Sequence, residues 1–185
     1  MYKFQVLLND DDFYEYNKHH QINSPAGKSG LLLYRIIVPL ATLCIFTSII
    51  AIFQTVLGSY PTVTITVFIT YFMTMTVFLI FSKRILLMSL KSGIKRMKKN
   101  GKLPYEPEYE IAFYDDCVIN TSRNMTTRFS YSIVERVDEG DKAIYIYINV
   151  NMAQIIPLAI FPGESEKRAF LEYLRSRCAF YSVYI

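Results

Sequence analysis

Three side chains near the N-terminus have a spacing that could bind a metal ion. Asp11, Glu15 and His19 follow one another at intervals of four residues, so one helix face would offer two carboxylates and an imidazole. His19 and His20 beside acidic residues are more typical of a solvated or membrane-interface helix face. We therefore predict no metal site and no cofactor.

Nucleophilic catalysis needs a nucleophile and a base within hydrogen-bond reach of it. The sequence contains no glycine-rich phosphate loop and no serine elbow. Its three cysteines, Cys44, Cys117 and Cys178, are widely spaced, and we interpret them as packing thiols rather than a disulfide frame or metal site. We predict that the protein is not an enzyme. A polar pocket lined by an acid and a base would support a third interpretation, an enzyme acting on lipid.

Positive charge is concentrated in one short stretch of the chain. The net charge is +4, yet residues 82–103 hold eight basic side chains and no acidic one. Such a cluster sets membrane topology and attracts anionic lipid at about 1 kcal/mol per cation. The candidate headgroup ligands are Lys83, Arg84, Lys91, Lys95, Arg96, Lys98, Lys99 and Lys102. We expect no nucleic-acid partner, because no aromatic residue interrupts these charges and an acidic segment follows them.

The longest apolar part of the chain lies directly before these charges. Residues 36–82 contain no Asp, Glu, Lys, Arg or His. Two segments within it, 36–57 and 62–81, can each cross a hydrocarbon core of about 30 Å, and residues 58–61 predict a tight turn between them. Basic residues flank both outer ends and are absent from the turn, so the positive-inside rule places both termini in the cytoplasm. We predict a multi-pass protein of the cytoplasmic membrane.

Hydroxyl and small side chains recur every four residues along both apolar segments. Such residues allow close approach of helix backbones. The predicted packing positions are Thr47, Ala51 and Thr55 on the first segment and Thr62, Thr66, Thr70 and Thr74 on the second. We expect them to pack within the hairpin or between protomers of a homo-oligomer. A transport path is not expected, because the hairpin carries no charge.

Two shorter elements precede the hairpin. Residues 2–8 are rich in strand-forming side chains, and Asn9 with the acidic residues 10–12 can cap a helix that continues to about His20. Residues 24–30 contain a proline and two glycines, so we predict a break that leads into the membrane. The strand at residues 2–8 could complete the sheet that begins at Tyr109, and the sequence leaves this open.

After the second apolar segment a basic amphipathic helix is expected up to Asn100 and Gly101, and a linker with two prolines follows. The hydrophobic period then changes to two. Strands are predicted at residues 109–114, 117–121, 127–131, 133–137, 143–150 and 153–157. A final helix at residues 164–178 has Phe170, Leu171, Leu174 and Cys178 on one face, which could cover an open side of the sheet.

The chain is accordingly divided into four parts: an N-terminal strand and helix at residues 1–30, a transmembrane hairpin at 31–82, a basic stalk at 83–103 and a β-rich domain at 104–185.

The order of these elements resembles the YcxB-like bacterial membrane proteins. The resemblance rests on Phe13 to Asn17 with His19 and His20, on Arg35, on Tyr131 to Ile133 opening a strand, and on Ile155 to Pro157 with Phe161. It covers nearly the whole chain and implies a membrane location, a pleckstrin-homology-like C-terminal domain and no settled activity. Two positions depart from the family pattern: residues 158–160 lack an expected basic residue, and Ser132 stands where an acidic residue is usual.

The expected fold is therefore a membrane α+β protein with a two-helix transmembrane hairpin and a small antiparallel β-barrel or sandwich of pleckstrin-homology type, capped by one C-terminal helix. Pleckstrin-homology domains that bind phosphoinositides carry Lys and Arg between their first two strands. We expect that loop at residues 114–117, where Asp115 and Asp116 would repel a phosphate. Inositide binding there is therefore disfavoured.

Two hypotheses about function follow from the sequence. In the first, the protein is a non-enzymatic anchor that presents a pleckstrin-homology-like interaction domain to a protein partner at the cytoplasmic face of the membrane. In the alternative, it is an anionic-lipid sensor or a self-protection (immunity) factor that acts through the hairpin and the basic stalk.

Overall fold

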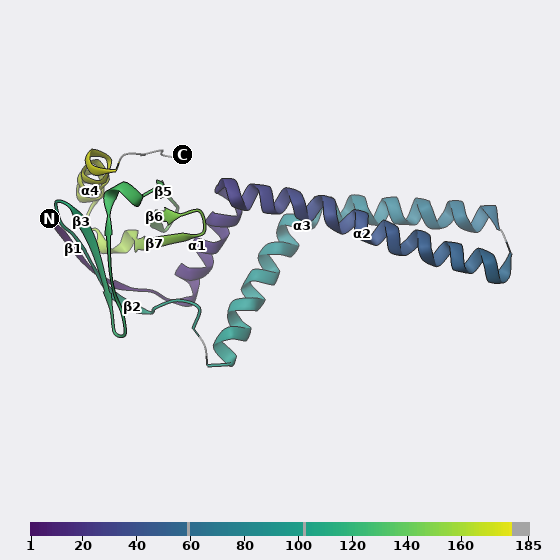
Figure 1. Ribbon diagram of the computed structural model, residues 1–185, viewed down its shortest axis with the longest axis horizontal. Coiled ribbons are helices and arrows are strands. Elements are labelled where there is room, and N and C mark those ends of the chain that lie inside the picture. The colour runs from purple at the N-terminus through teal and green to yellow at the C-terminus, as the bar shows by residue number, and fades with distance from the viewer. Residues whose placement is uncertain (59, 102, 179–185) are drawn as a thin grey trace.

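The computed structural model describes residues 1–58, 60–101 and 103–178, in which a β-rich body carries a long two-helix arm (Figure 1). In chain order the elements are β1 (Tyr2–Leu7), α1 (Asp10–Asn23), α2 (Pro25–Leu57), α3 (Pro61–Lys99), β2 (Glu108–Phe113), β3 (Cys117–Ser122), β4 (Thr126–Ser130), the 3₁₀ turn η1 (Tyr131–Ile133), β5 (Arg136–Glu139), β6 (Ala143–Asn149), β7 (Met152–Pro157), the 3₁₀ turn η2 (Leu158–Ile160) and α4 (Glu164–Arg177). We call α2 and residues 61–81 of α3 the helical arm, and the rest of α3, residues 82–99, its basic half.

The N-terminal strand is part of the sheet formed by the C-terminal half of the chain. β1 pairs antiparallel with β2, with Val6 opposite Tyr109, in a four-stranded sheet of order β1-β2-β3-β4. Val6 is completely buried. This confirms the open possibility that residues 2–8 complete the sheet. Consequently α1, α2 and α3 are inserted between the first and second strands of one β domain.

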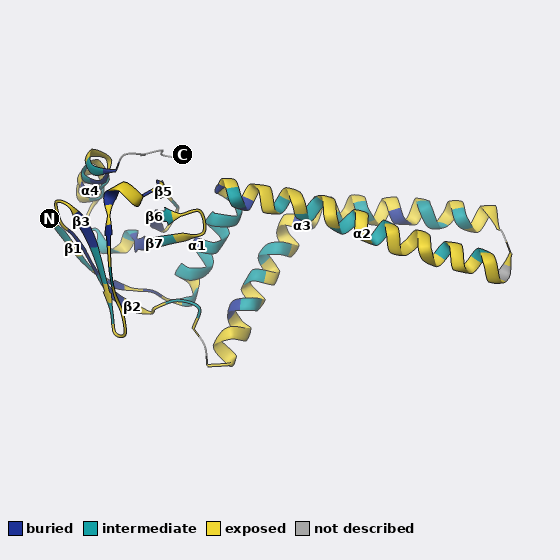
Figure 2. Ribbon diagram, viewed as in Figure 1, coloured by how far each residue is buried: buried dark blue, intermediate teal, exposed yellow. Residues whose placement is uncertain are grey.

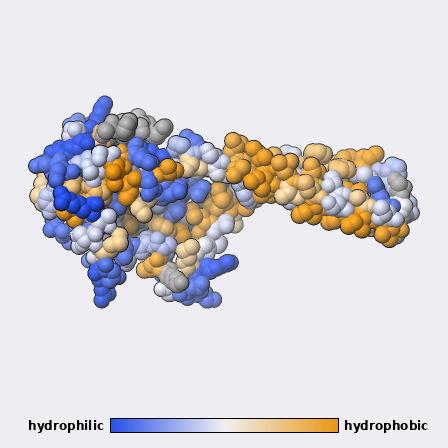
Figure 3. All heavy atoms as spheres, in the orientation of Figure 1, coloured by the Kyte–Doolittle hydropathy of each residue, from blue (hydrophilic) through white to orange (hydrophobic). Residues whose placement is uncertain are grey.

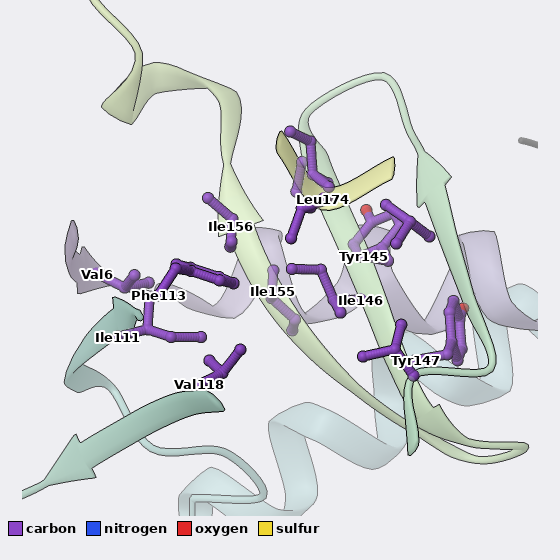
Figure 4. Packing of buried hydrophobic residues seen from close by; sticks show 14 of the residues in the cluster. Val6, Ile111, Phe113, Val118, Tyr145, Ile146, Tyr147, Ile155, Ile156 and Leu174 are labelled. Atoms are coloured by element: carbon purple, nitrogen blue, oxygen red, sulfur yellow. The ribbon is translucent and has the colours of Figure 1, made fainter. Parts of the chain in front are cut away.

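A second antiparallel sheet, β5-β6-β7, packs against the first. Figure 4 shows Phe113 and Val118 of the first sheet near Ile146 and Ile155 of the second, and all four belong to the buried core. Strand pairing does not join the sheets into a closed barrel within the described residues. Of the two predicted forms, the structure therefore fits two packed sheets and not a barrel.

The turn η1 explains why the first sheet ends where it does. Residues 131–133 were predicted to finish one strand and open the next, and this prediction is wrong. The Ser130 hydroxyl accepts a hydrogen bond from the Ser132 amide at 3.3 Å, and the buried Tyr131 side chain anchors the turn in the core. The chain thereby leaves one sheet and enters the other at Arg136.

Helix α4 covers the core, as its predicted apolar face indicated. Phe170 and Leu174 are fully buried and Cys178 is 7% exposed, whereas Leu171 is only partly buried. The Phe170 ring lies 5.2 Å from Tyr2, 5.1 Å from Phe4 and 5.0 Å from Phe113, measured between ring centroids. The two ends of the described chain are thus held in one aromatic cluster.

The break predicted at residues 24–30 is confined to Ser24, because α2 already begins at Pro25. The Ser24 hydroxyl caps the helix by accepting a hydrogen bond from the Gly27 amide at 2.8 Å, and proline is well tolerated at the first helical position. A β-carbon at Gly27 would lie 2.2 Å from the His20 carbonyl oxygen. Gly27 therefore allows the tight corner between α1 and α2.

The surface of the helical arm is predominantly apolar. Helices α2 and α3 are long and apolar enough to cross a membrane, judged by length and composition. Most of their apolar side chains are exposed, whereas those of the β domain are buried (Figure 2), and the arm is the hydrophobic end of the molecule (Figure 3). The second apolar segment and the basic residues that follow it form one continuous helix, α3.

Candidate functional site at the junction of the β domain and the helices

Helix α1 lies between the β domain and the basic half of α3, and we call these contacts the junction. Its start is fixed by a capping box: the Asn9 side chain accepts hydrogen bonds from the Asp11 and Asp12 amides at 2.8 and 3.0 Å, and the Asp12 carboxylate accepts one from the Asn9 amide at 3.1 Å. The predicted cap is thus confirmed, and it sets which face of α1 meets the sheet.

Aromatic side chains line the face of α1 that meets β6. Tyr16 is 8% exposed and donates a hydrogen bond to the Asn151 carbonyl at 3.1 Å. The ring centroid of His19 lies 4.7 Å from that of Tyr145, and the His20 ring stacks on Tyr147 at 5.8 Å. The sequence had suggested a solvated or membrane-interface helix face for His19 and His20, and the structure places both against β6 instead.

A buried charge cluster on β5 completes this side of the junction. Arg136 donates through Nε to Asp138 Oδ2 at 3.1 Å, and His19 Nε2 lies 3.3 Å from the same oxygen. The Arg136 guanidinium also lies 3.7 Å from the ring centroid of Tyr147. Asp138 is 1% exposed, so its charge depends on these partners for compensation. Helix α1 is therefore coupled to the β domain by a buried contact between His19 and Asp138.

His19 uses both of its ring nitrogens inside the junction. Asn23 Nδ2 lies 3.0 Å from His19 Nδ1, and an amide that donates there leaves the imidazole proton on Nε2, facing Asp138. An adjacent cavity of about 210 Å³ is lined by Glu15, Lys18, His19, Ile22, Asn23, Asp141, Lys142 and Tyr145. Glu15 is paired with Lys18 at 2.7 Å. Glu15 and His19 are therefore both engaged in contacts with the protein itself, and the exposed Asp141 is a second acid at this cavity.

The three side chains whose spacing could have bound a metal ion do not come together. Glu15 pairs with Lys18, and His19 contacts Asp138, whereas the Asp11 side chain is exposed and its backbone amide donates to the cap residue Asn9. In the part of the chain that the structure describes, no three His, Cys, Asp or Glu side chains are arranged to hold a metal ion. His19 instead joins α1 to β5 through its contact with Asp138.

Burial lowers the pKa of His20 below its ordinary value of 6.5, and the nearby Arg136 charge lowers it further. An imidazolium at this position would add a second positive charge beside Arg136 in a poorly solvated place. The junction is therefore built around an uncharged His20.

The opposite side of α1 meets the basic half of α3 through exposed contacts. Lys98 Nζ lies 2.6 Å from Asp10 Oδ2, the Tyr105 hydroxyl donates to Asp10 Oδ1 at 2.6 Å, and Lys91 Nζ lies 5.7 Å from the centroid of Tyr14. The Lys98 contact lowers the pKa of Asp10, and burial together with Asp10 raises the pKa of Tyr105 to about 12. Two of the predicted headgroup ligands are thus engaged by α1.

The remaining predicted headgroup ligands have open surroundings. Lys83, Arg84, Lys95, Arg96 and Lys99 are exposed, and none forms an ion pair with another described residue. Lys102 lies outside the described residues. The structure therefore leaves five cations of the basic half available.

The predicted packing positions do not form the contact between the two helices of the arm. Thr47, Ala51, Thr55, Thr62, Thr66, Thr70 and Thr74 are all exposed. Hydroxyls such as those of Thr66 and Thr70 donate to the carbonyl four residues earlier, at 2.9 Å each. These residues therefore do not pack the two helices of one hairpin against each other. Their packing between protomers stays a prediction.

Other polar residues connect the two helices instead. Arg35 donates to the Ser82 hydroxyl at 2.8 Å, the Tyr71 hydroxyl donates to the Pro39 carbonyl at 2.6 Å, and Gln54 donates to the Thr64 hydroxyl at 3.0 Å. Sequence reasoning missed these pairs. The available signal was their polarity on otherwise apolar helices, where polar side chains commonly bridge neighbours.

The loop at residues 114–117 joins β2 to β3, so it does not connect the first two strands as predicted. That position is occupied by the three inserted helices, because β1 is the first strand of the sheet. Asp115 and Asp116 pair with Arg177 at 2.7 Å and Arg128 at 3.0 Å. Their carboxylates contact cations of the protein itself.

These features define a class of protein: a small β domain of two antiparallel sheets and one covering helix, interrupted after its first strand by long apolar helices. Comparison with protein families matches residues 113–174 to the YcxB-like protein family. This match covers about a third of the chain and confirms the resemblance over these residues, whereas Phe13 to Asn17, His19, His20 and Arg35 lie outside them. It runs from the end of β2 to α4 and includes Arg136 and Asp138. Comparisons with curated proteins and with solved structures gave no match.

Proposed function

We propose that the protein is a non-enzymatic membrane anchor, in which the helical arm crosses the cytoplasmic membrane and holds the β domain at its cytoplasmic face for a protein partner. The observation that carries this proposal is the insertion of the arm between β1 and β2. Because both ends of the arm continue into one folded domain, that domain must lie on a single side of any membrane the arm crosses.

The surface of the arm supports membrane insertion. Apolar side chains as large as Ile52 and Phe72 are 65% and 61% exposed, which is costly in water and favourable in hydrocarbon. Arg35 and the basic half of α3 lie near the end of the arm that joins the β domain. The described residues of the turn at the other end of the arm carry no charge. The positive-inside rule then favours a cytoplasmic location for both termini.

The β domain suits an interaction role of pleckstrin-homology type. A four-stranded and a three-stranded antiparallel sheet with a C-terminal helix agree with that fold in number and order of elements. β4 is an outer strand of the first sheet, and its second edge pairs with no described strand. A partner strand could add to this edge through main-chain hydrogen bonds.

Membrane topology is tested first, with single-cysteine reporters. In a background that carries Cys44→Ser, Cys117→Ala and Cys178→Ala, Tyr60→Cys places the single thiol at the turn of the arm, and Met125→Cys places it on the β domain. A membrane-impermeant maleimide added to intact cells should label the first reporter and reach the second only after lysis. Labelling of Met125→Cys in intact cells would overturn the proposed orientation.

Partner binding is tested by photocrosslinking of the full chain in its native membrane. A photoreactive amino acid at Thr126, on the open edge of β4, should give a defined protein adduct that is absent with the same probe at the exposed Glu172 of α4. Recovery of lipid adducts alone from both positions would contradict the partner role and favour the second candidate, lipid sensing. That candidate is supported by the five unpaired cations of the basic half.

A further inference from the structure

The basic half of α3 does not continue the line of the helical arm. Figure 1 shows α3 turning away from α2 and running beside α1. The contacts of Lys91 with Tyr14 and of Lys98 with Asp10 give the two helices opposite directions, since the later residue of α3 meets the earlier residue of α1. This segment is therefore a transverse helix and not the stalk expected from the sequence.

The two faces of this transverse helix differ in composition. Ile94 is 7% exposed, and the flanking Leu87 and Leu90 are half-buried on the same side. Arg84, Met88, Lys95 and Lys99 are exposed and follow one another by four, seven and four residues, which places them together on a second face, about 110° around the helix from Ile94. Met88 is 64% exposed and Ile85 is 42% exposed beside these cations.

The position of α1 shows on which side of the β domain the transverse helix lies. In Figure 1 the β domain lies on one side of α1, and the basic half of α3 lies on the other, the side toward which the arm extends. If the arm crosses a bilayer, the transverse helix is therefore on the side of α1 nearer to the surface of that bilayer, and its cations are exposed there. Cations interleaved with exposed apolar side chains are the composition of helices that lie in the membrane interface.

We propose that the basic half of α3 lies on the cytoplasmic surface of the bilayer, binds anionic lipid headgroups through Arg84, Lys95, Arg96 and Lys99, and inserts Met88 among the acyl chains. This inference rests on the proposed membrane insertion of the arm and deepens it by naming the lipid class. The long aliphatic stems of Lys and Arg reach headgroups while Met88 enters the apolar layer. Because α1 is packed between this helix and the β domain, lipid binding fixes the orientation of the domain.

The absence of tryptophan from the whole sequence provides a clean test. Three full-length variants, M88W, M125W and F72W, are reconstituted in vesicles that contain brominated phosphatidylcholine, with and without phosphatidylglycerol. M88W should be quenched strongly, and more so with phosphatidylglycerol, whereas M125W on the β domain should be unaffected. Quenching of M88W no greater than that of M125W would overturn the interfacial helix.

F72W separates this inference from the proposed function. Its side chain lies in the middle of the arm, so it should be quenched with or without anionic lipid. Quenching of F72W without quenching of M88W leaves the membrane anchor intact and refutes only the interfacial helix. If F72W is not quenched, membrane insertion itself fails.

Charge dependence is measured in the M88W background. The fourfold variant R84Q/K95Q/R96Q/K99Q should lose the increase in quenching that phosphatidylglycerol causes. A matched variant that neutralises four cations of the β domain, K3Q/R123Q/R128Q/R168Q, should keep it. High salt should reproduce the first variant, because exposed charges are screened. An increase that persists in the first variant would refute headgroup binding through these residues.

Discussion

The two sides of α1 form very different contacts, one buried and one open to water. Toward the β domain, His19 reaches Asp138 within a buried cluster that includes Arg136. Toward α3, Lys98 meets Asp10 at the surface, where water and salt compete. Loss of a charge should therefore cost more stability on the β-domain side of α1 than on the α3 side.

Of the substitutions that test the two sides of α1, one at Asp138 is expected to reduce stability the most. Asp138→Asn should destabilise the β domain by about 3–5 kcal/mol, because it leaves Arg136 buried without a counter-charge. Chemical unfolding of the full chain in detergent measures the change. Asp141→Asn is the matched control, since Asp141 is exposed and should leave the midpoint unchanged. An equal effect of the two substitutions would show that the buried cluster contributes no special stability.

The next largest loss of stability is expected at the corner between α1 and α2. Gly27→Ala should cost about 1–3 kcal/mol, because the new β-carbon would meet the His20 backbone and the chain must shift. Gly30 and Gly93 have nothing within 4 Å of an added β-carbon, so Gly30→Ala and Gly93→Ala should be neutral or slightly stabilising. The three unfolding midpoints decide the question, and a tolerated Gly27→Ala would mean that the corner is not tight.

A smaller, pH-dependent effect is expected from His20. Its pKa is lowered in the folded protein, so the unfolded chain takes up its proton first as the pH falls through 6.5. The stabilisation is thus complete above this value and declines below it. His20→Gln should reduce the slope of stability against pH in this range, as measured by thermal unfolding at several pH values. An unchanged slope would assign the pH dependence to other groups.

The smallest effect belongs to the outer side of α1. Lys98→Gln should leave the unfolding midpoint of the β domain nearly unchanged, because both Lys98 and Asp10 are well exposed. It should instead increase hydrogen exchange in the basic half of α3. A loss of stability comparable to that of Asp138→Asn would remove the distinction between the two sides.

Features that depend on local periodicity could be predicted from the sequence. Two apolar segments gave the helices of the arm, alternation gave most strands, and the spacing of Phe170 and Leu174 gave the buried face of α4. The capping residues at Asn9 were also evident. Each of these signals lies within a few residues of the element that it predicts.

Features that depend on tertiary contact could not be predicted. Asp138 is buried, whereas the neighbouring acidic residues Glu139 and Asp141 are exposed. The sequence around these three residues does not indicate which of them is buried. The composition around Gly27 indicated a loop. The close approach of the His20 backbone, which explains the glycine, is visible only in three dimensions. The turn of α3 beside α1 likewise depends on contacts between distant segments, and it converts an expected stalk into a transverse helix.

The pairing of β1 with β2 also imposes an order on biosynthesis. β1 is made about 100 residues before its partner strand, a delay of about 5–20 s at ordinary rates of translation. The sheet therefore cannot form until both helices of the arm have been synthesised. In the proposed membrane orientation, assembly of the β domain follows commitment of the arm to the bilayer, so a completed sheet marks a chain whose two crossings have already been made.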